Sequence, residues 1–145
     1  MNRERAGWIG VAAGAVTVLG APLEWAKASA GFFTVSKAGT AGDGTITLVL
    51  GVVMAILAFV VRGGSSSKVV RVGFAIASVL VTVVAVYDFI DISSSSTDDV
   101  STSPGLGLVL TLVGGVAGIV AGMMFFKTPA AAPVPADSTF APPPP

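Results

Sequence analysis

The chain has 145 residues, of which 53% are hydrophobic and 11% charged, with eight basic and eight acidic side chains and a formal net charge of zero. A soluble domain has roughly 25% charged residues, so this chain carries too few charges to cover a water-facing surface. The equal numbers of basic and acidic residues also differ from the basic excess of nucleic-acid-binding proteins, so no nucleic acid is expected as a partner. The composition predicts a membrane protein whose first partner is the lipid bilayer.

Cysteine and histidine are both missing from the sequence. This excludes disulfides, thiolate chemistry, imidazole metal ligands and histidine-based acid–base catalysis. The serines have no histidine to activate them, and no glycine-rich phosphate-binding motif is supported. We therefore expect no enzyme, no catalytic residues, no metal site and no cofactor.

Four apolar segments have the length of membrane-spanning helices. A helix needs about 20 apolar residues to cross roughly 30 Å of hydrocarbon. The segments cover residues 6–23, 44–61, 70–90 and 105–126, and the charge-free part of the third, Val72–Tyr87, is the shortest. A soluble bundle would need a charged face on each helix, but the run from Thr47 to Val61 has no charge. The prediction is an all-α membrane protein, a four-transmembrane-helix bundle over residues 1–127.

Six of the eight basic residues fall on one side of these helices, which the positive-inside rule makes the cytoplasmic side. They are Arg3, Arg5, Arg62, Lys68, Arg71 and Lys127, whereas Lys27 and Lys37 lie on the other side. Acidic residues gather on the outer side: Glu24, Asp43, Asp88, Asp91, Asp98 and Asp99. We therefore predict a multi-pass protein of the cell membrane with both termini in the cytoplasm.

The connections and the tail differ in character. The outer connection Glu24–Asp43 is expected to be an interfacial or short extended segment, and Ser93–Pro104 a mobile loop. Residues 128–145 hold seven of the nine prolines and are expected to be disordered. An alternative for the N-terminus is a signal peptide cleaved near Ala28 or Ala30, but its apolar run is long for that purpose and we favour a retained helix.

Small residues recur at a spacing of four on each expected helix, the pattern that lets membrane helices pack closely. The fourth helix has the clearest row. The glycines expected at helix contacts are Gly10, Gly14, Gly51, Gly114, Gly118 and Gly122. Four such faces favour a compact bundle, a homo-oligomer or docking into a larger membrane complex.

The outer acidic residues Asp88, Asp91, Asp43 and Glu24 are the candidate site. Asp88 and Asp91 lie three residues apart near the outer end of the third helix. One interpretation is an ion or proton site at a pore mouth. The other, which we favour, is a helix-end carboxylate that binds loop amides or pairs with Lys27 or Lys37.

Several short motifs occur in a set order: Asp43-Gly44, Tyr87-Asp88 with Asp91, Gly105-Leu106-Gly107-Leu108 and Gly114-Gly115. In this order the chain resembles small four-helix integral membrane proteins of actinobacteria over roughly residues 6–126. That family has no assigned activity, so the resemblance implies a topology and no chemistry.

The sequence favours a non-enzymatic membrane protein, a subunit or scaffold of a membrane assembly. No ionisable residue lies near the middle of an expected helix, and no proline interrupts one, as ion and substrate sites require. The alternative is a small cation channel or transporter with an acidic outer mouth.

Overall fold

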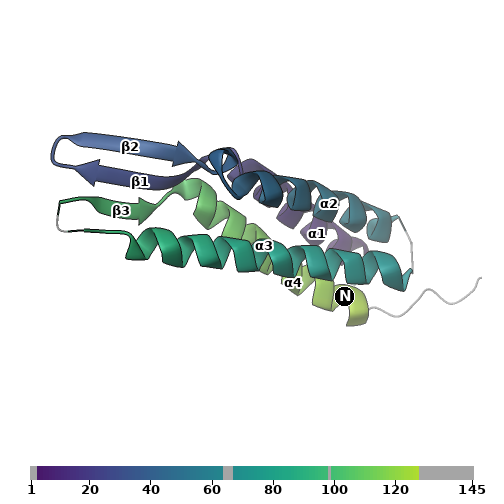
Figure 1. The fold of residues 1–145 in the computed structure, drawn as a ribbon. Coiled ribbons are helices and arrows are strands. Elements are labelled where there is room, and N and C mark those ends of the chain that lie inside the picture. Colours follow the sequence, from purple (N-terminus) through teal and green to yellow (C-terminus); the bar gives the residue numbers. More distant parts are fainter. Residues whose placement is uncertain (1–2, 64–66, 98, 128–145) are drawn as a thin grey trace, which may run out of the picture.

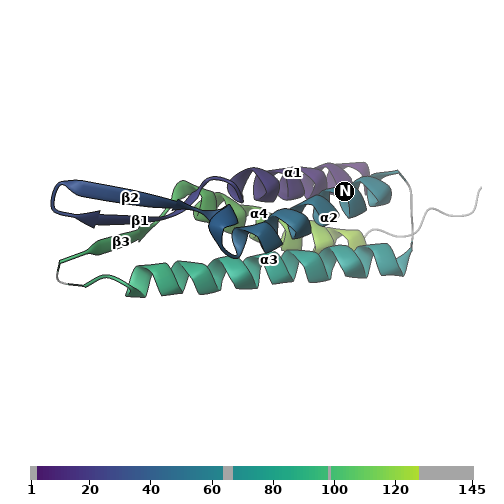
Figure 2. The ribbon, with the colours of Figure 1, turned by 45° about the horizontal axis from the view of Figure 1, so that its top comes forward.

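Four helices run side by side in the structure, a computed structural model that describes residues 3–63, 67–97 and 99–127 (Figure 1). They are α1 (Arg3–Gly20), α2 (Gly44–Arg62), α3 (Lys68–Ser94) and α4 (Leu106–Lys127). Helix α1 packs along α2 and α4, and α3 packs along the same two helices (Figure 2). The prediction of four helices is confirmed, with bounds within a few residues of those expected.

Helix α1 approaches its neighbours most closely where small residues face each other. A Cβ added at Gly14 would lie 2.7 Å from the backbone nitrogen of Ala55 on α2. A Cβ added at Gly114 on α4 would lie 2.9 Å from the carbonyl oxygen of Ala13. Only a glycine hydrogen fits at such distances, so the backbones of α1, α2 and α4 meet almost directly.

Large apolar side chains fill the interior of the bundle. The rings of Phe74 and Phe125 meet edge to face, with centroids 5.0 Å apart and an interplanar angle of 63°. Other fully buried apolar side chains are Met54, Val61, Val81 and Leu108.

The buried hydroxyl groups bind carbonyl oxygens of their own helices. Thr17 donates to Ala13 at 3.0 Å, and Ser78 donates to Phe74 at 2.8 Å. Such bonds satisfy a polar side chain without a partner from another helix. The interior therefore combines apolar packing with hydroxyls that are already hydrogen-bonded.

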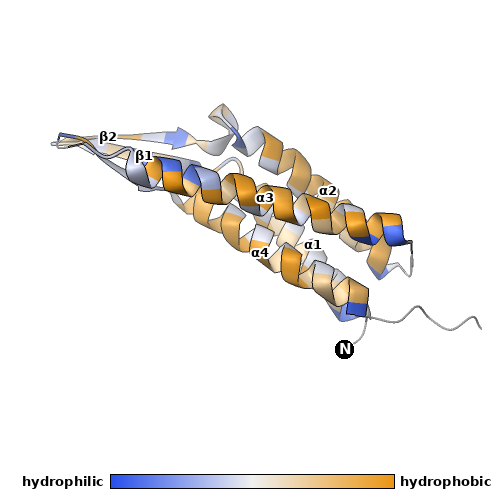
Figure 3. Cartoon of the chain, turned by 60° about the horizontal axis from the view of Figure 1, so that its bottom comes forward, coloured by the Kyte–Doolittle hydropathy of each residue, from blue (hydrophilic) through white to orange (hydrophobic). Residues whose placement is uncertain are grey.

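The outward faces are apolar along most of the helices (Figure 3). In the described part of the chain, α2, α3 and α4 are long and apolar enough to cross a membrane. Helix α1 is not among these three, and its 18 residues begin with the charged sequence Arg3-Glu4-Arg5. These features are consistent with a membrane protein.

A three-stranded antiparallel sheet extends from one end of the bundle (Figure 1). Its strands are β1 (Glu24–Ala30), β2 (Phe33–Ala38) and β3 (Ser101–Pro104), in the order β2-β1-β3. A two-residue turn with Gly31 at φ 56° joins β1 to β2, and a glycine in this position suits a tight hairpin. Ala28 pairs with Val35 on one side and with Thr102 on the other.

The sheet changes three expectations. The all-α description is wrong, because both outer connections contribute strands and pair with each other. The loop expected over 93–104 is instead the end of α3 and strand β3, separated by a short connection. The short extended segment expected after Glu24 is a full hairpin, followed by a 3₁₀ turn at Gly39–Ala41. The tail at 128–145, predicted to be disordered, lies outside the described residues.

Candidate functional site

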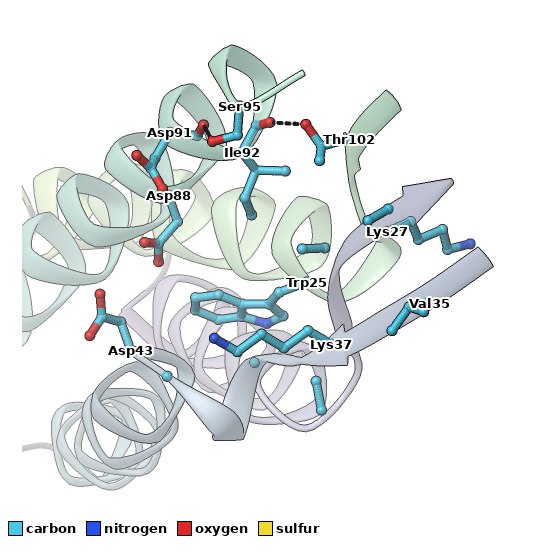
Figure 4. Close-up of a pocket in the computed structure, with 15 residues that line it drawn as sticks. Trp25, Lys27, Val35, Lys37, Asp43, Asp88, Asp91, Ile92, Ser95 and Thr102 are labelled. Carbon is cyan, nitrogen blue, oxygen red and sulfur yellow. Dashed lines mark hydrogen bonds between the residues drawn. The ribbon is translucent and has the colours of Figure 1, made fainter. Parts of the chain in front are cut away.

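A cavity of about 420 Å³ lies between the sheet and the outer end of α3, and we call it the outer pocket (Figure 4). Strands β1 and β2 supply one wall, and the last turns of α3 supply the opposite wall. Gly42 and Asp43, just before α2, close one end, and Thr102 of β3 lies at the other. Residues from both outer connections therefore build one concave site.

Trp25 anchors the sheet to the bundle and lines the outer pocket. Its side chain is only 5% exposed, and its indole Nε1 donates a hydrogen bond to the carbonyl oxygen of Gly20 at 3.0 Å. Its own carbonyl accepts from the backbone nitrogen of Gly105 at 2.7 Å. Because Gly39 also packs against the indole, this one residue joins the ends of α1 and β2 to the start of α4.

Hydrogen bonds also fix the α3 wall. The hydroxyl of Thr102 donates to the carbonyl oxygen of Ile92 at 2.8 Å, which ties β3 to α3. The hydroxyl of Ser95 donates to the carbonyl oxygen of Asp91 at 2.7 Å and closes the last turn (Figure 4). These bonds use backbone carbonyls, so they leave the carboxylates of this wall available.

Three of the four predicted acidic residues line the outer pocket: Asp43, Asp88 and Asp91. Asp43 occupies the N-cap position of α2 but makes no capping hydrogen bond with its side chain. The carboxyl groups of Asp43 and Asp88 point toward one another (Figure 4). The negative charges of Asp43 and Asp91 both lie close enough to Asp88 to repel a negative charge on its carboxyl group. The Oδ2 atom of Asp88 is buried and has no hydrogen-bond partner among the described residues.

The fourth predicted residue, Glu24, does not line the pocket. Its Oε1 lies 2.8 Å from Nζ of Lys27, and both side chains are substantially exposed. An exposed pair of this kind contributes about 0–1 kcal/mol. It is the one ion pair found across residues 3–63, 67–97 and 99–127, so Lys27 pairs with Glu24 and not with Asp88.

Trp25 is a pocket residue that the site prediction did not include, and Lys37 entered that prediction only as an ion-pair partner of the helix-end carboxylate, a pair that does not form within the described ranges. Lys37 lies on β2 two residues after Val35, so both project from the same face of the strand into the pocket. The alternation of Phe33, Val35 and Lys37 with Thr34 and Ser36 was a strand signal that could have placed Lys37 here. Trp25 lies in the connection Glu24–Asp43, which was expected only as an interfacial or short extended segment.

The acidic side chains are not gathered tightly enough for a metal centre. Within the described ranges, no group of three or more His, Cys, Asp or Glu residues could hold a metal ion. Calcium takes 6–8 oxygen ligands at about 2.3–2.6 Å, whereas this pocket is wide and partly lined by apolar residues.

The glycines predicted at helix contacts face different amounts of space. A Cβ at Gly10 would lie 2.9 Å from the Ala58 Cβ, and one at Gly51 would lie 3.0 Å from Thr17. A Cβ at Gly118 would meet the flexible end of Met54, and one at Gly122 would lie 3.6 Å from Ala75, an ordinary contact. Close approach is therefore greatest for α1 against α2 and α4.

Comparison with protein-family models and with curated proteins finds no match for this chain.

Proposed function

We propose that this protein is a non-enzymatic integral membrane protein that serves as a subunit or scaffold of a membrane assembly, and that its outer hairpin binds the partner. The observation that carries this proposal is strand β2. All six of its residues are exposed, and it forms an edge of the sheet. An exposed edge strand offers unpaired backbone groups on which another chain can add a strand.

The tip of the hairpin supports the same proposal. Phe32 is fully exposed, Phe33 is 80% exposed and Val35 is 69% exposed. The tip is the part of the sheet farthest from the helices (Figure 2), so these side chains extend beyond the apolar belt that faces lipid. Large aromatic residues exposed away from lipid are typical of binding surfaces. The partner we propose is an extended segment of another protein on the same side of the membrane.

We further propose that all four helices cross the membrane and that both termini are cytoplasmic. The start of α1, the end of α2, the start of α3 and the end of α4 lie at the end of the bundle opposite the sheet (Figure 1). That end carries Arg5, Arg62, Lys68, Arg71 and Lys127. The positive-inside rule places this end in the cytoplasm and the sheet outside.

The alternative function, a cation channel or transporter, has less support. Fully buried Phe74, Phe125, Met54 and Leu108 occupy the bundle interior. The buried hydroxyls of Thr17, Ser78 and Thr111 donate within their own helices and so do not line a continuous polar path. The acidic groups lie in the outer pocket, at one end of the bundle.

Site-specific photocrosslinking tests the scaffold proposal. A benzophenone amino acid replaces Phe32 in one variant and Tyr87, which is 68% exposed on the lipid-facing side of α3, in the control. In native membranes we expect irradiation to give a discrete protein adduct from position 32, and none from position 87. The adduct should weaken in a Val35→Lys background, which changes β2 without changing the probe.

The mass of the adduct distinguishes the partners. An adduct of twice the chain mass makes the partner a second copy and the assembly a homo-oligomer. An adduct of another fixed mass, co-purified in stoichiometric amount in mild detergent, makes it a larger membrane complex. Equal labelling patterns at positions 32 and 87, or no protein adduct at either, would refute binding through the hairpin.

A further inference from the structure

The outer pocket has the size of a small-molecule site. Its volume of about 420 Å³ falls within the range of about 300–1,000 Å³ that such sites occupy. Five parts of the chain line it: β1, β2, the residues just before α2, the end of α3 and β3. Trp25, which is almost completely buried, ties β1 to the end of α1 and to the start of α4 through two hydrogen bonds.

The charges that line the pocket favour a cation. Asp43, Asp88 and Asp91 contribute three carboxyl groups, while Lys27 is already paired with Glu24. Lys37 also lines the pocket, but no ion pair joins it to an acidic residue within the described ranges. The carboxylates therefore outnumber the unpaired ammonium groups, and a positively charged ligand would balance the excess.

The hydrogen bonds that the carboxyl groups of the pocket can accept indicate which kind of cation would bind there. Its buried Oδ2 accepts no hydrogen bond from any described residue, although buried polar atoms normally have a partner. A carboxylate oxygen needs an N–H or O–H donor, and a primary ammonium group brings three donors. A quaternary ammonium group has no donor to offer to the carboxylate oxygens of the three aspartates that line the pocket.

The remaining lining favours an organic ligand over a metal ion. Trp25, Val35 and Ile92 present apolar surface to the cavity, which can pack against carbon atoms next to the ammonium group. No three acidic residues of the described chain are placed to share a metal ion. The pocket therefore combines acceptors for N–H donors with a wall for an attached carbon chain.

We propose that the outer pocket binds a primary ammonium group, carried either by a small free amine or by the headgroup of phosphatidylethanolamine. The pocket lies at the outer end of α3, where lipid headgroups would meet a bundle that spans the membrane. This ligand site goes beyond the scaffold proposal and shares only Val35 with the exposed residues at the hairpin tip, because neither Phe32 nor Phe33 lines it, and Asp88→Asn leaves the hairpin unchanged. Loss of amine binding and loss of the crosslink at position 32 are therefore separate results.

The test uses the full chain, purified in a nonionic detergent and titrated with ethanolamine in a calorimeter. Choline, which has the same charge but no N–H donor, is the matched ligand control. In a second arm, the chain is placed in phosphatidylcholine nanodiscs doped with phosphatidylethanolamine or phosphatidylglycerol, and native mass spectrometry identifies the lipids that it retains. The variants are Asp88→Asn and, as a control at the opposite end of the bundle, Glu4→Gln.

We expect ethanolamine or phosphatidylethanolamine to bind in preference to choline and the other lipids. Loss of one charge-assisted hydrogen bond should weaken binding by between about tenfold and a hundredfold in Asp88→Asn, with no change in Glu4→Gln. Binding of free ethanolamine identifies a soluble amine as the ligand. Retention of phosphatidylethanolamine alone identifies the lipid headgroup.

Three results would overturn the proposal: no binding in either arm, equal binding of choline and ethanolamine, or undiminished binding in Asp88→Asn. Gel filtration and circular dichroism establish that each variant is folded. If Asp88→Asn does not fold, Asp91→Asn decides the question. The Asp91 carbonyl, and not its carboxylate, accepts the bonds from Ser94 and Ser95. Wild-type affinity in that variant would equally rule the site out.

Discussion

At the scale of single residues, Arg71 has a role that charge counting does not predict. The sequence treats it as one of the basic residues that orient the protein, but in the structure it is 9% exposed and its Nη1 donates to the carbonyl oxygen of Phe125 at 3.0 Å. The last carbonyls of a helix lack partners within the helix, and a cation there is favourable. The contact spans 54 residues, so no local pattern reveals it.

Replacing Arg71 should therefore destabilise the bundle. In Arg71→Met the Phe125 carbonyl loses its donor, and we expect the free energy of unfolding to fall by about 1–3 kcal/mol. Thermal unfolding in detergent, followed by circular dichroism, measures the change. Lys68→Met removes an exposed charge from the first turn of the same helix and should change the stability by less than about 0.5 kcal/mol. Similar losses in the two variants would show that the carbonyl bond contributes little.

At the scale of elements, the helices were predictable because their apolar segments are long. The sheet was not predicted, because the residues of its strands are not typical of strands. Strand β1 reads Glu-Trp-Ala-Lys-Ala-Ser-Ala, and β3 reads Ser-Thr-Ser-Pro. Alanine and proline are depleted in strands, and neither segment shows a run of β-branched residues. Pairing between β1 and β3 joins connections more than seventy residues apart, such as Ala28 with Thr102. The clearest local signal was Gly31, which begins a two-residue turn before the strand-forming residues Phe33, Thr34 and Val35.

The sequence predicted which helix faces carry small residues, but it did not predict how closely the backbones approach at each glycine. The four-residue spacing predicted equally that Gly14 and Gly122 lie at helix contacts. In the structure, Gly14 faces the backbone of α2 at Gly51 and Ala55, whereas Gly122 has room for a methyl group. Which glycines touch backbone depends on where two helices cross, and one sequence does not determine that position.

The two glycines should respond differently to the same substitution. A methyl group in Gly14→Ala would lie 2.7 Å from the Ala55 nitrogen and 2.9 Å from the Gly51 oxygen, and neither backbone atom can move by itself. We expect a loss of about 1–3 kcal/mol from overpacking. Gly122→Ala should be neutral, or stabilising by up to about 1 kcal/mol, because alanine favours helix. Detergent unfolding midpoints rank the two, and a greater loss in Gly122→Ala would contradict the observed packing.

At the scale of the whole molecule, the candidate site was predictable in position but not in composition. Alternating topology alone brings Asp43, Asp88 and Asp91 to the same end of the bundle. The sheet then decides which of them share a pocket, because it supplies the opposite wall and places Lys37 beside them. Glu24 is excluded because it lies on β1 beside Lys27. A site built on an unpredicted sheet could not be derived residue by residue.

The arrangement of the whole chain also makes its orientation testable. The sheet and the basic end lie at opposite ends of the bundle, so one reagent applied from outside should reach only one of them (Figure 3). The natural sequence contains no cysteine, so single-cysteine variants give labelling without background. Ser36→Cys places a thiol on exposed strand β2, and Ser67→Cys places one at an exposed position just before α3.

We expect an impermeant maleimide added to intact cells to label Ser36→Cys and to label Ser67→Cys only after the membrane is permeabilised. The physical reason is the excess of arginine and lysine at the end that holds Ser67, since basic residues near helix ends are retained on the cytoplasmic side. Labelling with a permeant maleimide controls for the reactivity of each thiol. Labelling of Ser67→Cys in intact cells, with Ser36→Cys protected, would invert the topology. The hairpin and the outer pocket would then face the cytoplasm, and both of their partners would have to be sought there.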